Sequence, residues 1–324
     1  MNLPRRHRDT ETGRGGDKET RRGGDKKQDP SCPLVPLSPC PLVFLSLWLC
    51  VSMAGLTCLI ASAAAHDLFL KFDSFFLEPN KKTTVRLMNG YFNRSENAVA
   101  RDRMRDVSVI TPSADRVNPP ASDWRDENDS ALLSFHAGAE GTYVAGVSTN
   151  PREITLKGAQ FNDYLRHDGV PDTLAQRRRD KELGESARER YSKHVKAIFQ
   201  VGESRTGSFK TALGYPVEII PRQNPYELKI GNTLEVLCVK DGAPVANQFV
   251  MAGRESNRRV IASPGVRADS NGVARVKLAG GGKWFIKFIH MTKLNEANLE
   301  IRTGGLAPGT GAGEMAYQIS SAED

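Results

Sequence analysis

The residue best placed to do chemistry in this chain is His66, because of what precedes it. Ala63 and Ala65 occupy the small-residue positions of a predicted signal-peptide cleavage site, so cleavage after Ala65 would make His66 the first residue. A terminal histidine offers its α-amine and its imidazole to one metal ion, and the amine, with a pKa of about 8, loses its proton at modest cost. The sequence therefore predicts a metal ligand at His66 in the processed chain.

A second imidazole would complete a site suited to Ni²⁺, Co²⁺ or Cu²⁺, and two other histidines are candidates for it. His290 ends the predicted strand 283–290, on an apolar face, where a histidine is more often a core or strand-end residue than a ligand. His136 ends the predicted strand 130–136, on its more polar face. The predicted metal ligands are therefore His66, His290 and His136.

Two further histidines and one cysteine have structural interpretations. His167 is predicted at a helix C-terminus, where the helix dipole favours a cation, and His194 is predicted to pack or to lie at the surface beside an apolar helix face. Cys238, the one cysteine after residue 65, lies in the apolar run 233–239 and is predicted to be a small buried hydrophobe. A single cysteine allows no internal disulfide in the processed chain.

The sequence lacks the motifs of the common enzyme classes. It has no Gly-x-Ser-x-Gly, no His-Glu-x-x-His and no phosphate-cradling glycine loop, so we predict that the protein is not an enzyme. Of the net charge of +7, the part after residue 65 carries +4, with both signs interspersed. The densest basic run, Arg177–Arg179, is predicted to be a solvated helix face. Without a basic stripe and stacking aromatics, nucleic-acid binding is not indicated.

The first 65 residues predict an export signal. Residues 1–40 are polar and of low complexity, and are predicted to be disordered. Residues 41–65 are apolar and approach the length of a membrane anchor, but their small-residue end favours a cleaved signal peptide. No second apolar run of about eighteen residues follows in the sequence. The processed chain is therefore predicted to be periplasmic or extracellular, without a membrane span.

From His66 onward the chain is rich in strand signals. Short runs of Val, Leu, Ile, Phe and Tyr alternate with Pro, Asn, Asp and Gly, as is typical of antiparallel β-sandwiches. The predicted strands of an N-terminal unit are 67–72, 82–88, 105–110, 130–136 and 141–148. Those of a second unit are 215–220, 233–239, 245–251, 257–262, 273–278, 283–290 and 315–319.

Helical signals separate these two units. Ser186 is predicted to cap a helix whose apolar side is Ala187, Tyr191, Val195, Ile198 and Phe199. In the second unit Asp241-Gly242 predicts a hairpin turn, and the Gly- and Pro-rich stretch 303–313 predicts a loop. The expected fold class is mainly β, with an N-terminal β-sandwich over 66–157, a helical connector over 158–212 and an immunoglobulin-like β domain over 213–324.

Several segments together resemble a known family. They are His66–Leu70, Tyr191–Gly202, Gly214–Pro221 with the following Asn224-Pro225-Tyr226, Asp269–Gly272 and Trp284–Met291. Their order and spacing are similar to those of the periplasmic family labelled nickel-uptake substrate-specific region, or periplasmic component of a cobalt/nickel transport system. The likeness covers essentially the whole processed chain. The chain departs from that family at 303–313, where a Gly-rich stretch replaces the usual acidic and aromatic residues.

The resemblance implies an extracytoplasmic metal-binding protein that serves uptake or homeostasis of nickel, cobalt or copper. Its partner would be a metal permease in the cytoplasmic membrane. Two alternatives stay open. A structural or adhesive envelope module would use the immunoglobulin-like half, but the β-rich pattern alone supports it, and a fold does not fix a function. A copper enzyme with a terminal-histidine brace would need a platform of exposed aromatic residues, which the sequence does not indicate.

Overall fold

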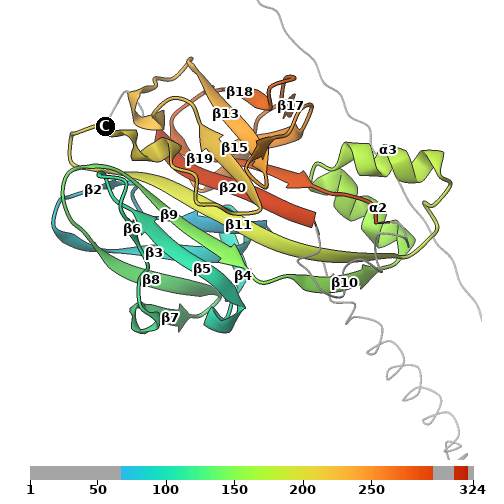
Figure 1. Cartoon of the computed structure of the whole chain (residues 1–324), viewed down its shortest axis with the longest axis horizontal. Coiled ribbons are helices and arrows are strands. Elements are labelled where there is room, and N and C mark those ends of the chain that lie inside the picture. Colours follow the sequence, from blue (N-terminus) through green and yellow to red (C-terminus); the bar gives the residue numbers. More distant parts are fainter. Residues whose placement is uncertain (1–66, 295–309, 320–324) are drawn as a thin grey trace, which may run out of the picture. The chain divides into compact units, whose positions relative to one another are not determined.

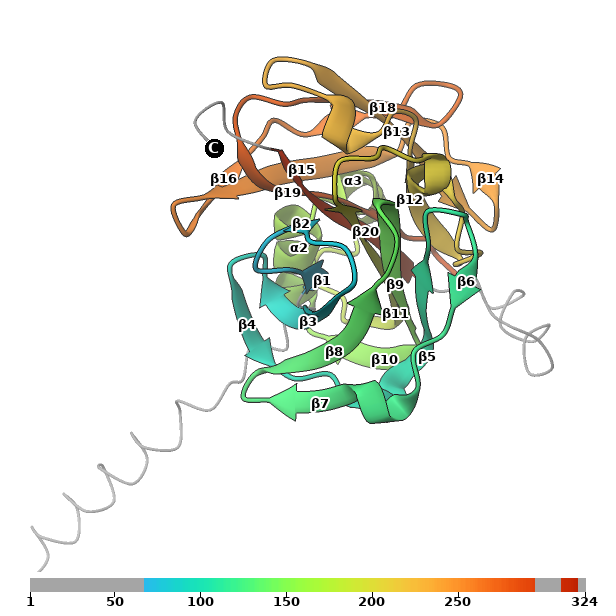
Figure 2. The ribbon, with the colours of Figure 1, turned by 90° about the vertical axis from the view of Figure 1, so that its left-hand side faces the viewer.

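The alternating apolar residues form strands that stack in three layers. The computed structural model describes residues 67–294 and 310–319, so the predicted leader, the signal peptide and His66 lie outside the described residues. A five-stranded sheet (sheet A) covers one face of an eleven-stranded sheet (the central sheet), and a four-stranded sheet (sheet C) covers the other. Figures 1 and 2 show the central sheet between the two outer sheets.

The strands of each sheet come from both nearby and distant parts of the chain. Sheet A contains β1 (Asp67–Lys71), β3 (Lys81–Tyr91), β4 (Arg94–Asn97), β7 (Trp124–Glu127) and β8 (Ser130–Ala137). The central sheet contains β2 (Phe76–Leu77), β5 (Met104–Ile110), β6 (Arg116–Val117), β9 (Gly141–Thr149), β10 (Arg152–Leu156), β11 (Ala187–Val201), β15 (Phe249–Ser256), β16 (Arg259–Ala262), β17 (Val266–Arg267), β19 (Gly282–His290) and β20 (Thr310–Ile319). Sheet C contains β12 (Val217–Pro221), β13 (Thr233–Lys240), β14 (Ala243–Pro244) and β18 (Val273–Lys277).

Short helical elements connect these strands. The 3₁₀ turns are η1 (Arg101–Arg103), η2 (Ala121–Asp123), η3 (Gly207–Lys210) and η4 (Pro225–Glu227).

The predicted hairpin turn joins β13 to β14. Asp241 has a φ of 50° and Gly242 a φ of 78°, and these are the left-handed conformations that a two-residue type I′ turn requires.

The middle of the central sheet is buried on both faces, so β9 and residues 194–201 of β11 have no side toward solvent. In β9 the side chain of Tyr143 belongs to the core against sheet A, whereas that of Val144 belongs to the core against sheet C. All nine residues of β9 are buried. Gly146 is needed in this strand because a Cβ there would lie 2.3 Å from Leu213 Cδ1 and 2.7 Å from Tyr215 Oη.

The helix predicted to begin after Ser186 is wrong, because Ala187–Val201 form the fifteen-residue strand β11. The prediction relied on apolar residues spaced near the helical period of 3.6. Val195, Ala197 and Phe199 also fit the two-residue period of a strand, and all three belong to the core against sheet A. The intervening residues are buried as well, which concealed the strand period. β11 pairs with β9 and β10 along one edge and with β2 and β20 along the other, so the sheet satisfies its backbone groups.

The predicted loop 303–313 is also wrong from Thr310 onward, where β20 begins. β20 lies between β19 and β11, antiparallel to the first and parallel to the second. Its glycines Gly311 and Gly313 pair with His290 and Phe288. Local composition indicated a loop, but two neighbouring strands supply hydrogen-bond partners on both edges, and tertiary context outweighs local propensity here.

The two predicted sandwiches share the central sheet. Sheet A and the central sheet enclose one core, which includes Phe69, Phe72 and Phe199. Sheet C and the central sheet enclose the second, which includes Trp284 and Cys238. The predicted fold class is confirmed: the chain is mainly β, with two β-sandwiches and a helical segment between their strands. β20 joins the two halves within one sheet.

Within residues 67–294 and 310–319, the α-helices lie in a short part of the predicted connector. They are α2 (Gly158–His167) and α3 (Pro171–Arg179), which lie together beyond β10 in Figure 1. The prediction of a solvated basic face at the end of α3 is wrong for Arg177, which is buried. Its Nε donates to Asn162 Oδ1 at 3.0 Å and one terminal nitrogen donates to the Glu185 carbonyl at 2.7 Å. Arg177 therefore joins α3 to α2 and to the loop that leads into β11.

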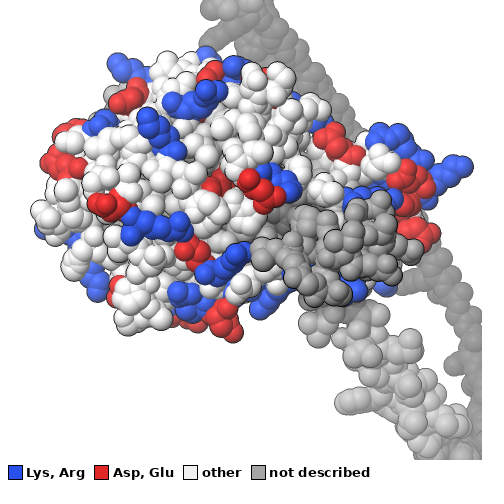
Figure 3. Space-filling view, viewed as in Figure 1, with Lys and Arg blue, Asp and Glu red and all other residues white. Residues whose placement is uncertain are grey.

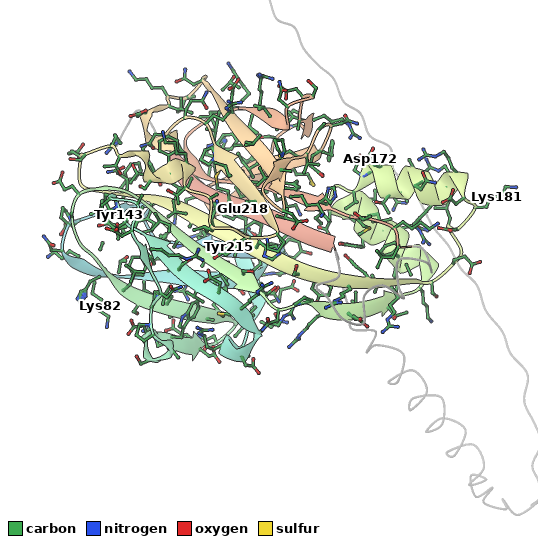
Figure 4. The ribbon with its side chains drawn as sticks, in the orientation of Figure 1. Lys82, Tyr143, Asp172, Lys181, Tyr215 and Glu218 are labelled. Carbon is green, nitrogen blue, oxygen red and sulfur yellow. The ribbon has the colours of Figure 1, made fainter. Side chains whose placement is uncertain are left out.

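A buried ion pair lies on the face of β11 that looks toward sheet C. Lys196 and Glu218 are each 2% exposed, and their charged atoms lie 2.7 Å apart. Burial alone would raise the pKa of Glu218, but Lys196 and the backbone N–H groups of Leu213 and Tyr215 outweigh it and lower the pKa. Figure 4 shows Glu218 and Tyr215 next to each other beside β11. The carboxylate thus stays ionised inside the protein and holds the start of sheet C against β11.

We expect Lys196→Met to lower the free energy of unfolding by about 3–5 kcal/mol, because it leaves the buried Glu218 carboxylate without its cation. Urea unfolding would measure this. Arg188→Met is the matched control on the same strand: its ion pair with Glu153 is largely exposed, so we expect a loss of about 1 kcal/mol or less. Equal losses in the two variants would contradict the structural role given to Lys196.

His194 lies two residues before Lys196, on the same face of β11, and is 3% exposed. Its Nδ1 and Nε2 each lie 2.9 Å from a serine hydroxyl, those of Ser148 and Ser192. Burial lowers the pKa of His194 to about 4, so the ring is neutral at physiological pH. The prediction of a packing residue is correct, and its surface alternative is wrong.

The low pKa of His194 predicts acid sensitivity. The unfolded chain binds the proton first, so the contribution of His194 is complete above pH 6.5 and falls by about 3 kcal/mol as the pH drops to about 4. Urea unfolding as a function of pH should show a flatter curve for His194→Gln than for the unmodified protein. His167→Gln, at an exposed histidine, should keep the original slope. A His194→Gln curve with that same slope would rule out the assignment.

Candidate functional site

A cluster of charged and polar side chains surrounds the beginning of β1, directly after the predicted cleavage site. We call it the β1 charge cluster, and it consists of Asp67, Tyr164, Asp168, Glu189 and Lys287. These residues come from β1, from α2 and the residue that follows it, from β11 and from β19. The cluster therefore depends on the meeting of four elements that are far apart in the sequence.

Lys287 is the centre of the cluster. Its Nζ donates to Asp67 Oδ2 and, at 3.2 Å, to Asp168 Oδ1. The Lys287 side chain is 6% exposed, and those of Asp67 and Asp168 are 18% and 19% exposed. Burial raises the pKa of Asp168, Lys287 opposes this, and the negative charge of Asp67 adds to it. One ammonium group thus holds two partly desolvated carboxylates together.

Tyr164 and Glu189 extend the cluster toward the helices. The Tyr164 hydroxyl donates to Glu189 Oε1 at 3.1 Å. Burial raises the pKa of Tyr164 well above its ordinary value, and the charges of Glu189, Asp168 and Asp67 raise it further. Tyr164 is therefore a neutral hydrogen-bond donor. With three carboxylates around it, this end of β1 is an environment that favours cations.

The described residues do not by themselves form a metal site. Within 67–294 and 310–319, no group of three or more His, Cys, Asp or Glu side chains is arranged to hold a metal ion. In the β1 charge cluster Lys287 already takes the position of a cation between Asp67 and Asp168. Any metal ion bound here would need further ligands and would compete with this ammonium group.

His66 lies outside the described residues, but its chain neighbour Asp67 is fixed by Lys287. The Cα atoms of adjacent residues are about 3.8 Å apart, so residue 66 is attached directly to the β1 charge cluster. Among the three predicted metal ligands, His66 is therefore the one whose position in the chain adjoins a group of carboxylates.

His290 ends β19, as predicted, but its side chain is directed away from the β1 charge cluster. Trp284, Ile286 and Phe288, which share its strand face, belong to the core against sheet C, whereas Lys287 is on the opposite face. His290 Nδ1 lies 3.2 Å from Gln248 Oε1. Burial and the nearby Lys240 lower the pKa of His290. The structure does not bring His290 to the start of β1.

His136 is also separated from the start of β1. It is exposed, and it pairs with Lys82 near the beginning of β3, whereas Asp67 pairs with Gly90 near the end of that strand. Eight residues of extended chain span about 26 Å. In Figure 4 Lys82 lies at the opposite end of the molecule from the two helices beside which Asp168 is placed. His136 and Asp67 therefore belong to different ends of sheet A.

The other two interpretations agree with the structure. His167 is the last residue of α2, as predicted. Cys238 is a free, fully buried thiol in the core against sheet C, and burial raises its pKa to about 12. Its role is that of a small core side chain.

Sequence reasoning missed Asp168, Glu189 and Lys287. Asp67 and Lys287 are 220 positions apart in the sequence, and no local motif links them. One signal was present: Lys287 is the single charged residue in the apolar run Trp284–Ile289, and a lysine inside a buried strand requires a carboxylate partner. Which carboxylate this is could not be read from the sequence.

The surface and the helices add two observations. On the face shown in Figure 3, Lys and Arg side chains lie among Asp and Glu side chains instead of forming a separate basic area. In the part of the chain that the structure describes, neither helix has the length and apolar character needed to cross a membrane.

Comparisons with solved structures gave distant similarities. The D0–D1 domain of intimin is 13% identical at a TM-score of 0.18, over 78% of this chain and 98% of that domain. The human OSCAR ligand-binding domain is 8% identical at a TM-score of 0.18, over 78% and 99%. A tetra-tandem repeat from the extending region of a large adhesion protein is 8% identical at a TM-score of 0.21, over 79% of this chain and 50% of that one.

The search of curated proteins gave no match. A family model does match: its description is "Domain of unknown function (DUF4198)", and it covers residues 63–292. The match begins at the predicted cleavage site and includes β1, both helices, β11 and β19, and hence every residue of the β1 charge cluster. The chain belongs to the DUF4198 family.

Proposed function

We propose that this protein is an extracytoplasmic metal-binding protein for nickel, cobalt or copper, with its site at His66 after cleavage following Ala65. The observation that carries the proposal is the position of Asp67. The residue next to the predicted new terminus is anchored by Lys287 in a group of partly buried carboxylates.

The ligand chemistry is consistent with these metals. The α-amine and imidazole of His66 are nitrogen donors, and the next residue, Asp67, shares the ammonium of Lys287 with Asp168, so two carboxylates are candidates for the oxygen ligands. Mixed nitrogen and oxygen sites suit Ni²⁺, Co²⁺ and Cu²⁺, with Cu²⁺ bound most tightly in the usual order of affinities. The resemblance to the nickel- and cobalt-uptake family supports the same class of metal, and it suggests a permease as the partner.

The first test concerns the terminal amine. We expect the protein that begins at His66 to bind Cu²⁺ or Ni²⁺ at least about tenfold more tightly than a form with one extra serine before His66, a difference of about 1.4 kcal/mol. The reason is that the extra residue converts the amine into an amide, which is a far poorer ligand. Isothermal titration calorimetry measures both affinities. Equal affinities would show that the terminal amine is not a ligand.

The second test concerns the carboxylates. We expect Asp168→Asn to weaken metal binding by about 10–100-fold, because the carboxylate either ligates the ion or orients the groups that do. His290→Ala is the matched control and should leave the affinity unchanged, since its side chain lies on the other face of β19. If His290→Ala lost binding and Asp168→Asn did not, the metal would be bound on the sheet C side.

A further inference from the structure

The thioether of Met251 lies beside the β1 charge cluster, on a neighbouring strand. Met251 of β15 pairs with Lys287 of β19, and these two strands run side by side in the central sheet (Figure 1). Paired residues of adjacent strands point to the same face of a sheet, so the side chain of Met251 is on the Lys287 side. Its strand neighbours Val250 and Ala252 point the other way, into the core against sheet C.

A glycine brings this sulfur close to Asp168. Gly169 follows Asp168 at the end of α2 and has a φ of 75°, the left-handed conformation that often ends a helix. A Cβ at residue 169 would lie 2.3 Å from Met251 Sδ and 2.8 Å from its Cγ, so the sulfur can occupy this place only because residue 169 is glycine. Met251 Sδ therefore lies against the residue next to Asp168, which accepts from Lys287 Nζ at 3.2 Å.

Apolar packing does not account for this position. Among the described residues, four other methionines belong to an apolar core or pack against one: Met88, Met104, Met291 and Met315. Met251 is partly buried and is not part of any of these cores. A methionine commonly serves as an adaptable filler of core gaps. This one instead places a polarisable sulfur next to a group of carboxylates.

We propose that Met251 is a ligand of the metal site at the start of β1 and that this site takes copper as Cu⁺. In the processed chain its partners are the α-amine and the imidazole of His66, so the assignment of Met251 rests on the proposed function. Soft thioether donors select Cu⁺, whereas imidazole and carboxylate donors suit divalent metals. Met251 therefore decides which metal the site prefers, and the carboxylates of the cluster supply the negative charge that favours a cation.

The test compares the binding of Cu⁺ and of Ni²⁺ to the chain that begins at His66. Cu⁺ affinity is measured without oxygen, in ascorbate, by competition with a chromophoric Cu⁺ chelator, and Ni²⁺ affinity is measured by calorimetry. We expect Met251→Leu to weaken Cu⁺ binding at least about tenfold, since even an outer partner of a metal ligand typically contributes that much. The Ni²⁺ affinity should stay unchanged. Leucine nearly conserves the volume of methionine, so the fold should be retained.

Met104→Leu is the matched control. Met104 is a buried thioether of β5, and four strands of the central sheet separate β5 from β15, a distance of roughly 24 Å at about 4.8 Å between neighbouring strands. This variant should keep the full Cu⁺ affinity. X-ray absorption of the Cu⁺-loaded protein should show a copper–sulfur contact that persists in Met104→Leu and is lost in Met251→Leu, which separates Met251 from the buried thiol of Cys238.

The outcomes distinguish this assignment from the proposed function. If Met251→Leu kept the Cu⁺ affinity or the copper–sulfur contact, or if it weakened Cu⁺ and Ni²⁺ binding equally, the assignment of Met251 would be overturned. The proposed function would stand in each of these cases, provided that an extra serine before His66 still weakened Ni²⁺ binding. A processed chain that bound neither ion would overturn both.

Discussion

The structure depends on one constraint, which is that the central sheet is buried on both faces. Over residues 194–201, where both faces are buried, β11 cannot place polar side chains toward water, so every polar group there must find a partner inside the protein. In this part of β11 the face toward sheet A carries apolar residues alone, among them Val195, Ala197 and Phe199. The face toward sheet C carries His194 and Lys196, which are satisfied by two serines and by Glu218. The position of sheet C is thereby tied to particular residues of β11.

The same constraint explains where the charged groups gather. Along the middle of the central sheet, polar groups are few and individually paired. At the end where β1, β11 and β19 meet the helices, several charged side chains share one partly solvated region. Lys287 is compatible with its buried strand only because Asp67 and Asp168 converge on it. The β1 charge cluster is therefore a product of the architecture, and it lies where the predicted export cleavage would create a new terminus.

At the start of β1 an excess of carboxylates favours a cation, and the ammonium of Lys287 is the cation that lies there in the described residues. Its two ion pairs offset the cost of burying these charges.

The sequence by itself determined the mainly β class, most strand positions, the Asp241-Gly242 hairpin, the burial of Cys238 and the helix end at His167, because these follow from local alternation, turn chemistry and hydrophobicity. The tertiary structure decided the rest. β11 is a strand because neighbours on both edges and both faces outweigh its helical spacing, and β20 forms at Gly311 and Gly313 because β19 and β11 lie on either side of it. It also separated His136 and His290 from Asp67 and joined Asp67 to Lys287, since the local sequence can indicate that Lys287 needs a carboxylate partner but not which carboxylate, 220 positions away, the fold supplies.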